Sequence, residues 1–148
     1  MKFIETKESE IPLELLLQAD PSEQKIRSYI GSSLIFAAME SNAVIGVCVV
    51  GYLSEEKAEL FNVSVSKEFQ KKGVGTKLLE HVLETLKLKG VSRVELGTGT
   101  FGYQLTYYQR LGFRVSSVVK DHFIKNYSDP IYEQDIRLKD MLRLYINL

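Results

Sequence analysis

The sequence predicts a single α+β (α/β three-layer) domain over residues 1–148, in which a mixed, mostly antiparallel sheet of about seven strands carries helices on both faces. Two observations predict this fold class. In the first 65 residues, apolar runs are separated by short polar turns, which is typical of antiparallel hairpins. Further along, strand-like runs alternate with helical periodicity, which is typical of β-α-β units whose helices cover a sheet.

The first part of the chain is predicted to hold four strands and one capped helix. Asp20 is expected to cap a helix that ends near Ile30, because Pro21 suits the first helical position and Gly31 favours a stop. The second and third strands are expected to form a hairpin. The predicted strands are Lys2–Glu5, Leu34–Met39, Ala43–Leu53 and Ala58–Val65.

A long amphipathic helix is predicted from about Gly73 to Lys89. Its apolar residues recur at helical spacing and form one stripe, at Val74, Leu78, Leu79, Val82, Leu83 and Leu86. A strand, a glycine-rich loop, a short helix and another strand are expected next, at Val91–Leu96, Gly97–Gly102, Tyr103–Leu111 and Phe113–Val119. Lys120–Lys139 is expected to be irregular. Alternation from Leu142 to Leu148 predicts a half-buried last strand.

The composition favours an ordinary globular protein of the cytoplasm. The formal net charge is zero, with 19 basic and 19 acidic residues, which argues against a nucleic-acid partner. No apolar run approaches the roughly 18 residues that cross a membrane, and the first residues lack the apolar core of a signal peptide. The single cysteine, Cys48, excludes an internal disulfide and is expected to be a buried small hydrophobe.

A basic, glycine-containing turn between a strand and the long helix predicts an anion site. Main-chain N–H groups at a helix N-terminus, together with the positive end of the helix dipole, suit a diphosphate. The residues expected to bind it are Gln70, Lys71, Lys72, Gly73, Val74, Gly75 and Thr76.

Two motifs in this order resemble signatures of the GNAT N-acetyltransferase superfamily. The first resembles the family's Gln/Arg-x-x-Gly-x-Gly/Ala pattern and falls on Gln70, Gly73 and Gly75. The second resembles its Tyr-x-x-x-Gly-Phe ending and falls on Tyr108, Gly112 and Phe113. The tail is similar to an uncharacterised bacterial subgroup through Asp121-His122-Phe123, Tyr127, Pro130 and Asp140-Met141. The resemblance implies a GNAT-like acyl-CoA acyltransferase fold and N-acetyltransferase activity.

The resemblance implies acetyl-CoA as the co-substrate, with its diphosphate on the turn described above. The pantetheine arm would pair with the strand through Val63, Ser64 and Val65, where an N–H group would polarise the thioester carbonyl. Many members of the family have an asparagine in the loop before the last short helix. This loop has none, and Thr98 or Thr100 is expected to replace it.

Two residues are candidates for proton transfer. An alkyl amine has a pKa near 10, on the order of that of lysine, so a base must deprotonate it at neutral pH. Glu59 stands at the spacing before Gln70 where some family members carry a catalytic glutamate. Tyr108 occupies the family's usual position for the acid that protonates the leaving thiolate, and Tyr107 is its nearest rival. The implied acceptor is a small-molecule or peptide amine, and dimers are common in the family.

Other hypotheses remain open from the sequence alone. Gly97-x-Gly99-x-x-Gly102 matches a dinucleotide fingerprint, and Asp121 follows where a ribose-binding acid would stand, but the helix is short and few residues remain for further β-α units. A non-catalytic acyl-CoA sensor on the same fold is a further alternative. His81, His122 and Cys48 show no metal-ligand spacing, so no metal is expected.

Overall fold

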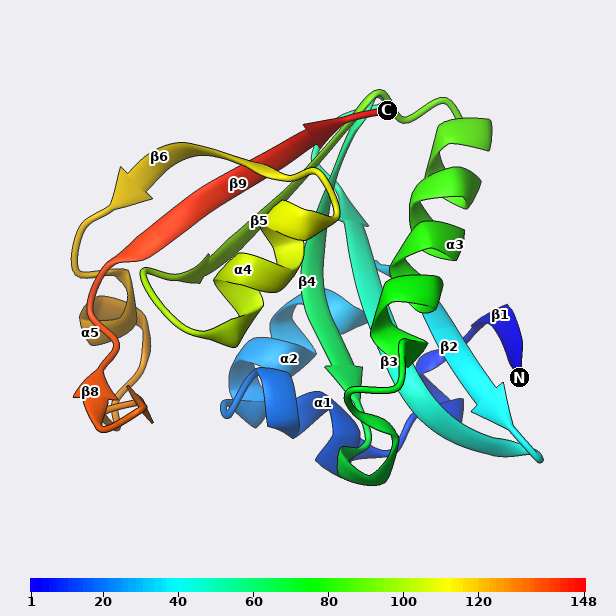
Figure 1. The fold of residues 1–148 in the computed structure, drawn as a ribbon, viewed down its shortest axis with the longest axis horizontal. Coiled ribbons are helices and arrows are strands. Elements are labelled where there is room, and N and C mark those ends of the chain that lie inside the picture. The colour runs from blue at the N-terminus through cyan, green and yellow to red at the C-terminus, as the bar shows by residue number, and fades with distance from the viewer. The chain divides into compact units, whose positions relative to one another are not determined.

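A computed structural model describes residues 1–148, and the chain divides into two compact units. The first unit comprises Met1–Ser92 with Leu148, and the second comprises Arg93–Asn147. The main sheet has seven strands, four from the first unit and three from the second, and the strand pairings within each unit are antiparallel (Figure 1). The predicted α+β class and number of strands are therefore confirmed.

The strands of the first unit follow one another in the sheet in chain order. They are β1 (Lys2–Thr6), β2 (Leu34–Glu40), β3 (Ala43–Tyr52) and β4 (Lys57–Val65). The predicted hairpin is confirmed, and its turn residues Ser41 and Asn42 both have a positive φ. The pairing of β3 with β4 skips Phe61, since Val49 is opposite Asn62 and Val50 is opposite Leu60. Phe61 is therefore the extra residue of a β-bulge.

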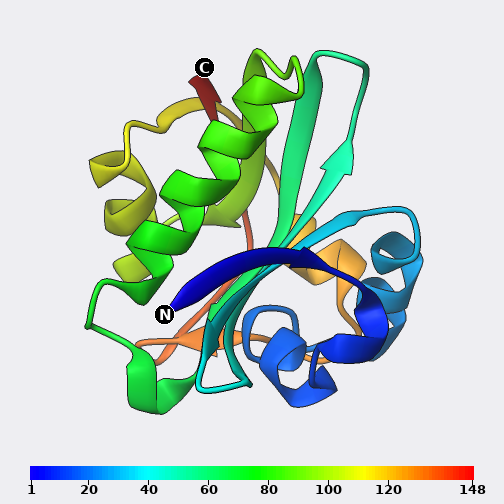
Figure 2. The same cartoon turned by 90° about the vertical axis from the view of Figure 1, so that its right-hand side faces the viewer.

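Three helices cover the two faces of this four-stranded part (Figure 2). The helices α1 (Leu13–Ala19) and α2 (Glu23–Ile30) lie on one face, and α3 (Val74–Leu88) lies on the other. Short 3-10 turns, η1 (Glu8–Glu10) and η2 (Lys67–Phe69), complete the unit. The core beneath α1 and α2 consists of apolar side chains, at Ile11, Leu15, Leu16, Ile26, Ile30, Ile35, Ala37, Val47 and Val49. The stripe on α3 buries Val74, Leu78, Leu79, Val82 and Leu86.

The prediction that Asp20 caps the second helix is wrong. The apolar run after Pro12 forms a helix of its own, and Asp20 ends it, since the Asp20 N–H donates to the Leu16 carbonyl at 3.1 Å. Ser22 is the N-cap of α2, and its Oγ accepts a hydrogen bond from the Lys25 N–H at 3.2 Å. Asp20 contributes to the same turn differently, because its Oδ1 accepts from the Ser22 N–H at 3.2 Å.

The second unit contains three strands of the main sheet, in the order β5-β9-β6. These are β5 (Arg93–Gly99), β6 (Arg114–Val119) and β9 (Met141–Asn147), with α4 (Tyr103–Arg110) between β5 and β6 in the chain. The segment expected to be irregular in fact forms α5 (His122–Asn126) and a small hairpin of β7 (Tyr132–Glu133) and β8 (Ile136–Arg137). Gln134 and Asp135 make its turn with φ values of 51° and 62°. Neither is a glycine, so the usual sequence signal for such a turn was absent.

Candidate functional site

The turn that leads into α3 has the geometry of an anion site. Gly73 is the N-cap of α3 with φ 84°, a left-handed conformation that favours glycine, and Lys71 is also left-handed with φ 62°. The first bond of the helix runs from the Lys77 N–H to the Gly73 carbonyl at 3.1 Å, and no side chain caps the helix. The N–H groups of the first turn, on Val74, Gly75 and Thr76, therefore fall outside the pattern of intrahelical bonds. A left-handed residue followed by helical ones turns successive N–H groups toward one point.

Gln70 holds this turn against the end of β4. Its side-chain Nε2 donates to the Val65 carbonyl at 2.9 Å, and its main-chain N–H donates to the Lys67 carbonyl at 3.3 Å. The Val65 carbonyl accepts a second hydrogen bond at 2.9 Å from Nε2 of Gln18, which lies at the end of α1. Sequence reasoning missed Gln18, because it precedes Val65 by 47 residues and no motif marks it.

The main-chain groups of β4 point alternately to its two sides. The Ser66 N–H donates to the Ile45 carbonyl at 2.8 Å, so the next residue back, Val65, is a non-hydrogen-bonded partner of β3. By the same alternation, the N–H and carbonyl groups of Val63 and Val65 are directed away from β3, and those of Ser64 are directed toward β3. The Ser64 side chain is buried and accepts from Gln18 Nε2 at 3.1 Å. Of the three residues predicted to pair with an extended ligand, Val63 and Val65 thus present their main chain to the outer side of β4.

Positive charge surrounds the turn. Lys71 and Lys72 are exposed, and the Lys72 Nζ lies 5.8 Å from the centroid of the Phe69 ring. A cation over an aromatic face is held without being neutralised, so it still contributes to the potential that an approaching anion meets. The charges and the N–H groups together suit the diphosphate that the sequence predicts here.

Glu59 lies on β4 on the same face as α1 and α2. It is half-buried and is paired with Gly51 of β3, whose missing side chain leaves room for the Phe61 ring. Phe61 in turn stacks on Tyr29 of α2, with 5.0 Å between the ring centroids. Because cross-strand partners share a face, Glu59 points to the side of the sheet that carries α1 and α2.

In the second unit, the motif at Tyr108 is the C-terminal cap of α4. The Gly112 N–H donates to the Gln109 carbonyl at 3.1 Å, and the Phe113 N–H donates to the Tyr108 carbonyl at 3.1 Å. These two bonds and the left-handed Gly112, with φ 107°, constitute a Schellman motif. The rings of Tyr108 and Phe113 pack edge to face at 5.8 Å, which is the apolar contact that accompanies such a cap. The cap thus fixes the position of the Tyr108 main chain, from which the ring extends toward Phe113.

Replacing Gly112 with alanine is expected to lower the free energy of unfolding by about 1–3 kcal/mol, because a Cβ is strained at this φ. The added Cβ would also lie 3.2 Å from Ile146 Cδ1. Urea unfolding of the variant measures the loss. Gly31→Ala is the matched control, since Gly31 has φ −65° and open space around its Cβ position. Equal stability of the two variants would contradict the strain argument.

Thr98 and Thr100 are placed at and just after the end of β5. Thr98 is half-buried and pairs with Leu142 of β9, whereas Thr100 is exposed. The neighbouring glycines are explained by packing within the second unit. A Cβ on Gly97 would overlap the Met141 side chain, and a Cβ on Gly99 would lie 3.0 Å from Leu138 Cδ2. The dinucleotide hypothesis therefore has no support from these positions.

The main chain of Asp121 has a structural role at the start of α5. Its main-chain N–H donates to Asp140 Oδ1 at 2.8 Å, and its φ of 58° starts α5. The N–H of Asp121, with a smaller contribution from Lys120, holds the pKa of the Asp140 carboxyl below its usual range. The Asp121–Asp140 contact thus ties α5 to the start of β9.

Cys48, His81 and Glu95 each have contacts that explain their positions. Cys48 is fully buried, as predicted, and burial raises the pKa of its thiol. His81 stacks on Phe3 with 5.7 Å between ring centroids. Glu95 accepts from Arg93 Nε at 2.9 Å, and this bond, with a weaker one from Arg143, holds the pKa of its carboxyl below the ordinary value.

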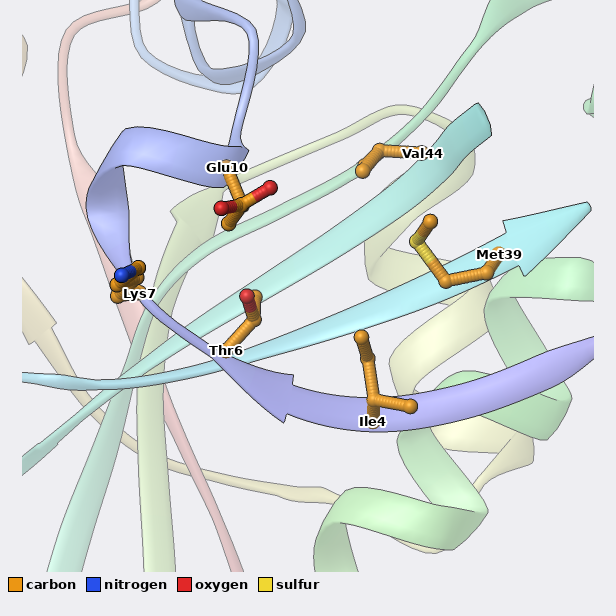
Figure 3. A pocket seen from close by; sticks show the side chains of 6 residues that line it. All are labelled: Ile4, Thr6, Lys7, Glu10, Met39 and Val44. Carbon is orange, nitrogen blue, oxygen red and sulfur yellow. The ribbon is translucent and has the colours of Figure 1, made fainter. Parts of the chain in front are cut away.

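No group of three His, Cys, Asp or Glu side chains lies together in a way that could hold a metal ion. No helix combines the length and the apolar character that crossing a bilayer requires. A hollow of about 380 Å³ lies beside the edge strand β1, lined by Ile4, Thr6, Lys7, Glu10, Met39 and Val44 (Figure 3). It contains none of the predicted site residues.

Comparison with known proteins gives a consistent result. The model of the family described as Acetyltransferase (GNAT) domain matches residues 31–115, which include parts of both units. A relative from Bacillus subtilis (strain 168), named uncharacterized N-acetyltransferase YvbK, is 35% identical over 136 residues, covering 91% of this chain and 88% of the relative.

Two solved structures are similar over nearly the whole chain. One, described as IAA acetyltransferase from Bacillus cereus ATCC 14579, is 40% identical with a TM-score of 0.94, and 99% of each chain is covered. The other is a GNAT family acetyltransferase from Elizabethkingia anophelis with acetyl-CoA bound. It is 35% identical with a TM-score of 0.94, covering 99% of this chain and 97% of that one. These likenesses confirm the fold that the two sequence motifs predict.

Proposed function

Because the chain belongs to the GNAT acetyltransferase family, we propose that it moves the acetyl group of acetyl-CoA to a primary amine by direct attack in a ternary complex. The observation that carries this proposal is the turn before α3, where a left-handed Gly73 directs uncapped N–H groups beside two exposed lysines. A similar protein from Elizabethkingia anophelis was solved with acetyl-CoA bound, which supports the same donor here. The Bacillus subtilis relative is named as an N-acetyltransferase, and this supports an amine as the acceptor here.

Residues of the first unit would bind acetyl-CoA through two of its parts, the diphosphate and the pantetheine arm. The N–H groups of Val74, Gly75 and Thr76, with the charges of Lys71 and Lys72, would bind the diphosphate. The outer main chain of β4 would bind the pantetheine arm as an added strand, through Val63 and the Val65 N–H. Gln70 would keep the turn in place, and Thr98 or Thr100 of the second unit would provide a hydroxyl.

The chain's own groups would supply both proton transfers. Glu59, directly or through water, would take the proton that the amine must lose before its lone pair forms the new C–N bond. The C–S bond then breaks, and the Tyr108 hydroxyl would give its proton to the leaving thiolate. The resulting phenolate would be reprotonated, directly or through water, by the second proton that the nitrogen loses as the amide forms. A main-chain N–H of β4 would stabilise the negative charge that gathers on the carbonyl oxygen in the transition state. The acceptor would be a small-molecule or peptide amine in the cytoplasm, and all 148 residues would act as one acetyltransferase domain.

The direct test is the release of the CoA thiol from acetyl-CoA with a broad panel of primary amines. Steady release that depends on one of the amines is the expected result, together with a rise in melting temperature on adding acetyl-CoA. Tight binding of CoA without turnover on any amine would instead identify a non-catalytic acyl-CoA sensor.

Replacing Glu59 with glutamine is expected to move the pH–rate profile toward alkaline pH. Without a base in the protein, the reaction depends on the fraction of amine already neutral in solution, which rises as pH approaches the amine's own pKa. Rates of acetyl transfer between pH 6 and 10 measure the change. Glu55→Gln is the matched control, since Glu55 is exposed in the turn before β4. An unmoved profile in Glu59→Gln would assign the deprotonation to another group.

A further inference from the structure

The side chain of Gln18, near the end of α1, connects that helix to the end of β4. Its Nε2 donates to Ser64 Oγ at 3.1 Å and to the Val65 carbonyl at 2.9 Å, so both hydrogens of the amide are used. A carbonyl can only accept, so the nitrogen of the amide must face Val65. The two contacts fall on consecutive residues of β4, and the peptide group that joins these residues carries the Val65 N–H. Gln18 therefore restrains the strand on both sides of this N–H.

The Val65 carbonyl is saturated by side chains of the protein. It accepts a second hydrogen bond from Gln70 Nε2 at 2.9 Å, and a carbonyl oxygen has two lone pairs. The peptide group to which this carbonyl belongs is also held from the side of β3, since the Ser66 N–H donates to the Ile45 carbonyl at 2.8 Å. A ligand strand beside β4 can therefore accept from the Val65 N–H but finds no free lone pair on the Val65 carbonyl.

The attachment of α1 to the sheet does not depend on Gln18. Leu15 and Leu16 of this helix are buried in the core beneath it, and the Leu16 carbonyl accepts from Asn62 Nδ2 of β4 at 3.0 Å. Gln18 is exposed, so no burial obliges its amide to find protein partners. Holding a glutamine in one rotamer costs conformational entropy. The effect of its two hydrogen bonds is therefore local, at the end of β4, where Val65 is only half-buried.

We propose that Gln18 is a positioning residue for acetyl-CoA, an assignment that rests on the proposed acetyltransferase function. The pantetheine arm would lie along the outer side of β4, where one of its carbonyl groups would accept from the Val65 N–H. Because Gln18 and Gln70 hold the end of the strand in advance, the N–H has its direction before the arm arrives, and binding has less ordering to impose. In this way α1 takes part in binding the cofactor without touching it.

The first test compares Gln18→Met with Glu14→Met. Gln18→Met keeps the length of the side chain but removes both N–H donors. It is expected to raise the Kd and the KM for acetyl-CoA about fivefold, while kcat at saturating acetyl-CoA stays within about twofold. Glu14→Met is the matched control, since Glu14 is exposed on the same helix, and its Kd is expected to stay within about twofold of wild type. An unchanged Kd in a folded Gln18→Met protein overturns the proposal.

A double-mutant cycle with Gln70→Met tests whether Gln18 acts through the Val65 carbonyl. In each single variant this oxygen keeps one side-chain donor, whereas in the double variant it has none. The rise in Kd of the double variant is therefore expected to exceed the product of the two single rises by about threefold. A rise equal to that product would show that the two glutamines act independently, and the proposed role of Gln18 would then be wrong.

The third test uses the wild-type protein and therefore does not depend on the folding of a variant. The backbone amide resonance of Val65 in NMR spectra is expected to shift on adding CoA more than that of Ser66, whose N–H is already bonded to Ile45. A Val65 resonance that saturating CoA leaves in place overturns the proposal. Failure of the wild type to bind acetyl-CoA or to acetylate any amine would instead overturn the proposed function itself, so the two failures are distinct.

Discussion

Replacing Gly75 with aspartate is expected to weaken acetyl-CoA binding about 100-fold, because it would add a carboxylate to the first turn of α3, whose N–H groups are proposed to bind the diphosphate. Two unit charges about 5 Å apart repel by about 3 kcal/mol at an effective dielectric constant near 20, and 1.4 kcal/mol corresponds to a factor of ten. Isothermal titration with acetyl-CoA at fixed ionic strength measures the affinity.

The same substitution should not weaken the helix. An acidic residue in the first turn stabilises a helix by about 0.3–1 kcal/mol, so a folded Gly75→Asp protein is expected. Gly75→Asn is the matched control, since it adds nearly the same volume without the charge. The asparagine variant is expected to bind more tightly than the aspartate variant. Wild-type affinity in a folded Gly75→Asp protein would place the diphosphate elsewhere.

Replacing Tyr108 with phenylalanine is expected to lower kcat at least about 10-fold while the affinity for acetyl-CoA stays the same. The change removes the hydroxyl that would protonate the thiolate. It keeps the ring, which packs edge to face on Phe113 and also lies 5.3 Å from the Tyr107 ring. Steady-state rates and a separate binding measurement give the two quantities.

Tyr107→Phe is the control for this experiment, because it removes a hydroxyl from the adjacent residue of α4. It is expected to retain kcat within about threefold, since general acid catalysis requires one hydroxyl at one position. Turnover at the wild-type rate in Tyr108→Phe, with a loss in Tyr107→Phe, would transfer the acid role to Tyr107.

Most elements could be predicted from sequence because their signals are local. The stripe of α3 and the hairpin of β2 and β3 lie within one segment each, and both were found within one or two residues. The cap of α2 was misplaced because Asp20 and Ser22 are both good capping residues, and only the preceding helix decides between them. The hairpin of β7 and β8 was missed because Gln134-Asp135 takes a glycine-like conformation without glycine.

The site was predictable only in part, because some of its residues form a continuous motif whereas others meet only in the folded chain. Gln70, Gly73 and Gly75 form a continuous motif, and the structure shows why the glycine at the N-cap is needed. Gln18 has no such motif. It belongs to the site through contacts with Ser64 and Val65, which are 46 and 47 positions away, and no single-sequence pattern encodes such contacts.

The Val65 carbonyl oxygen accepts two hydrogen bonds, and this has a consequence for how ligands influence one another. One oxygen atom accepts from Gln18 at the end of α1 and from Gln70 in the turn before α3. A ligand that breaks the hydrogen bond from Gln70 leaves Gln18 as the only side chain donating to this oxygen. The energy of the hydrogen bond from Gln18 then changes. If a ligand at the turn changes the affinity of the α1 side for a second ligand in this way, thermodynamic linkage requires the second ligand to change the affinity of the turn for the first by the same factor.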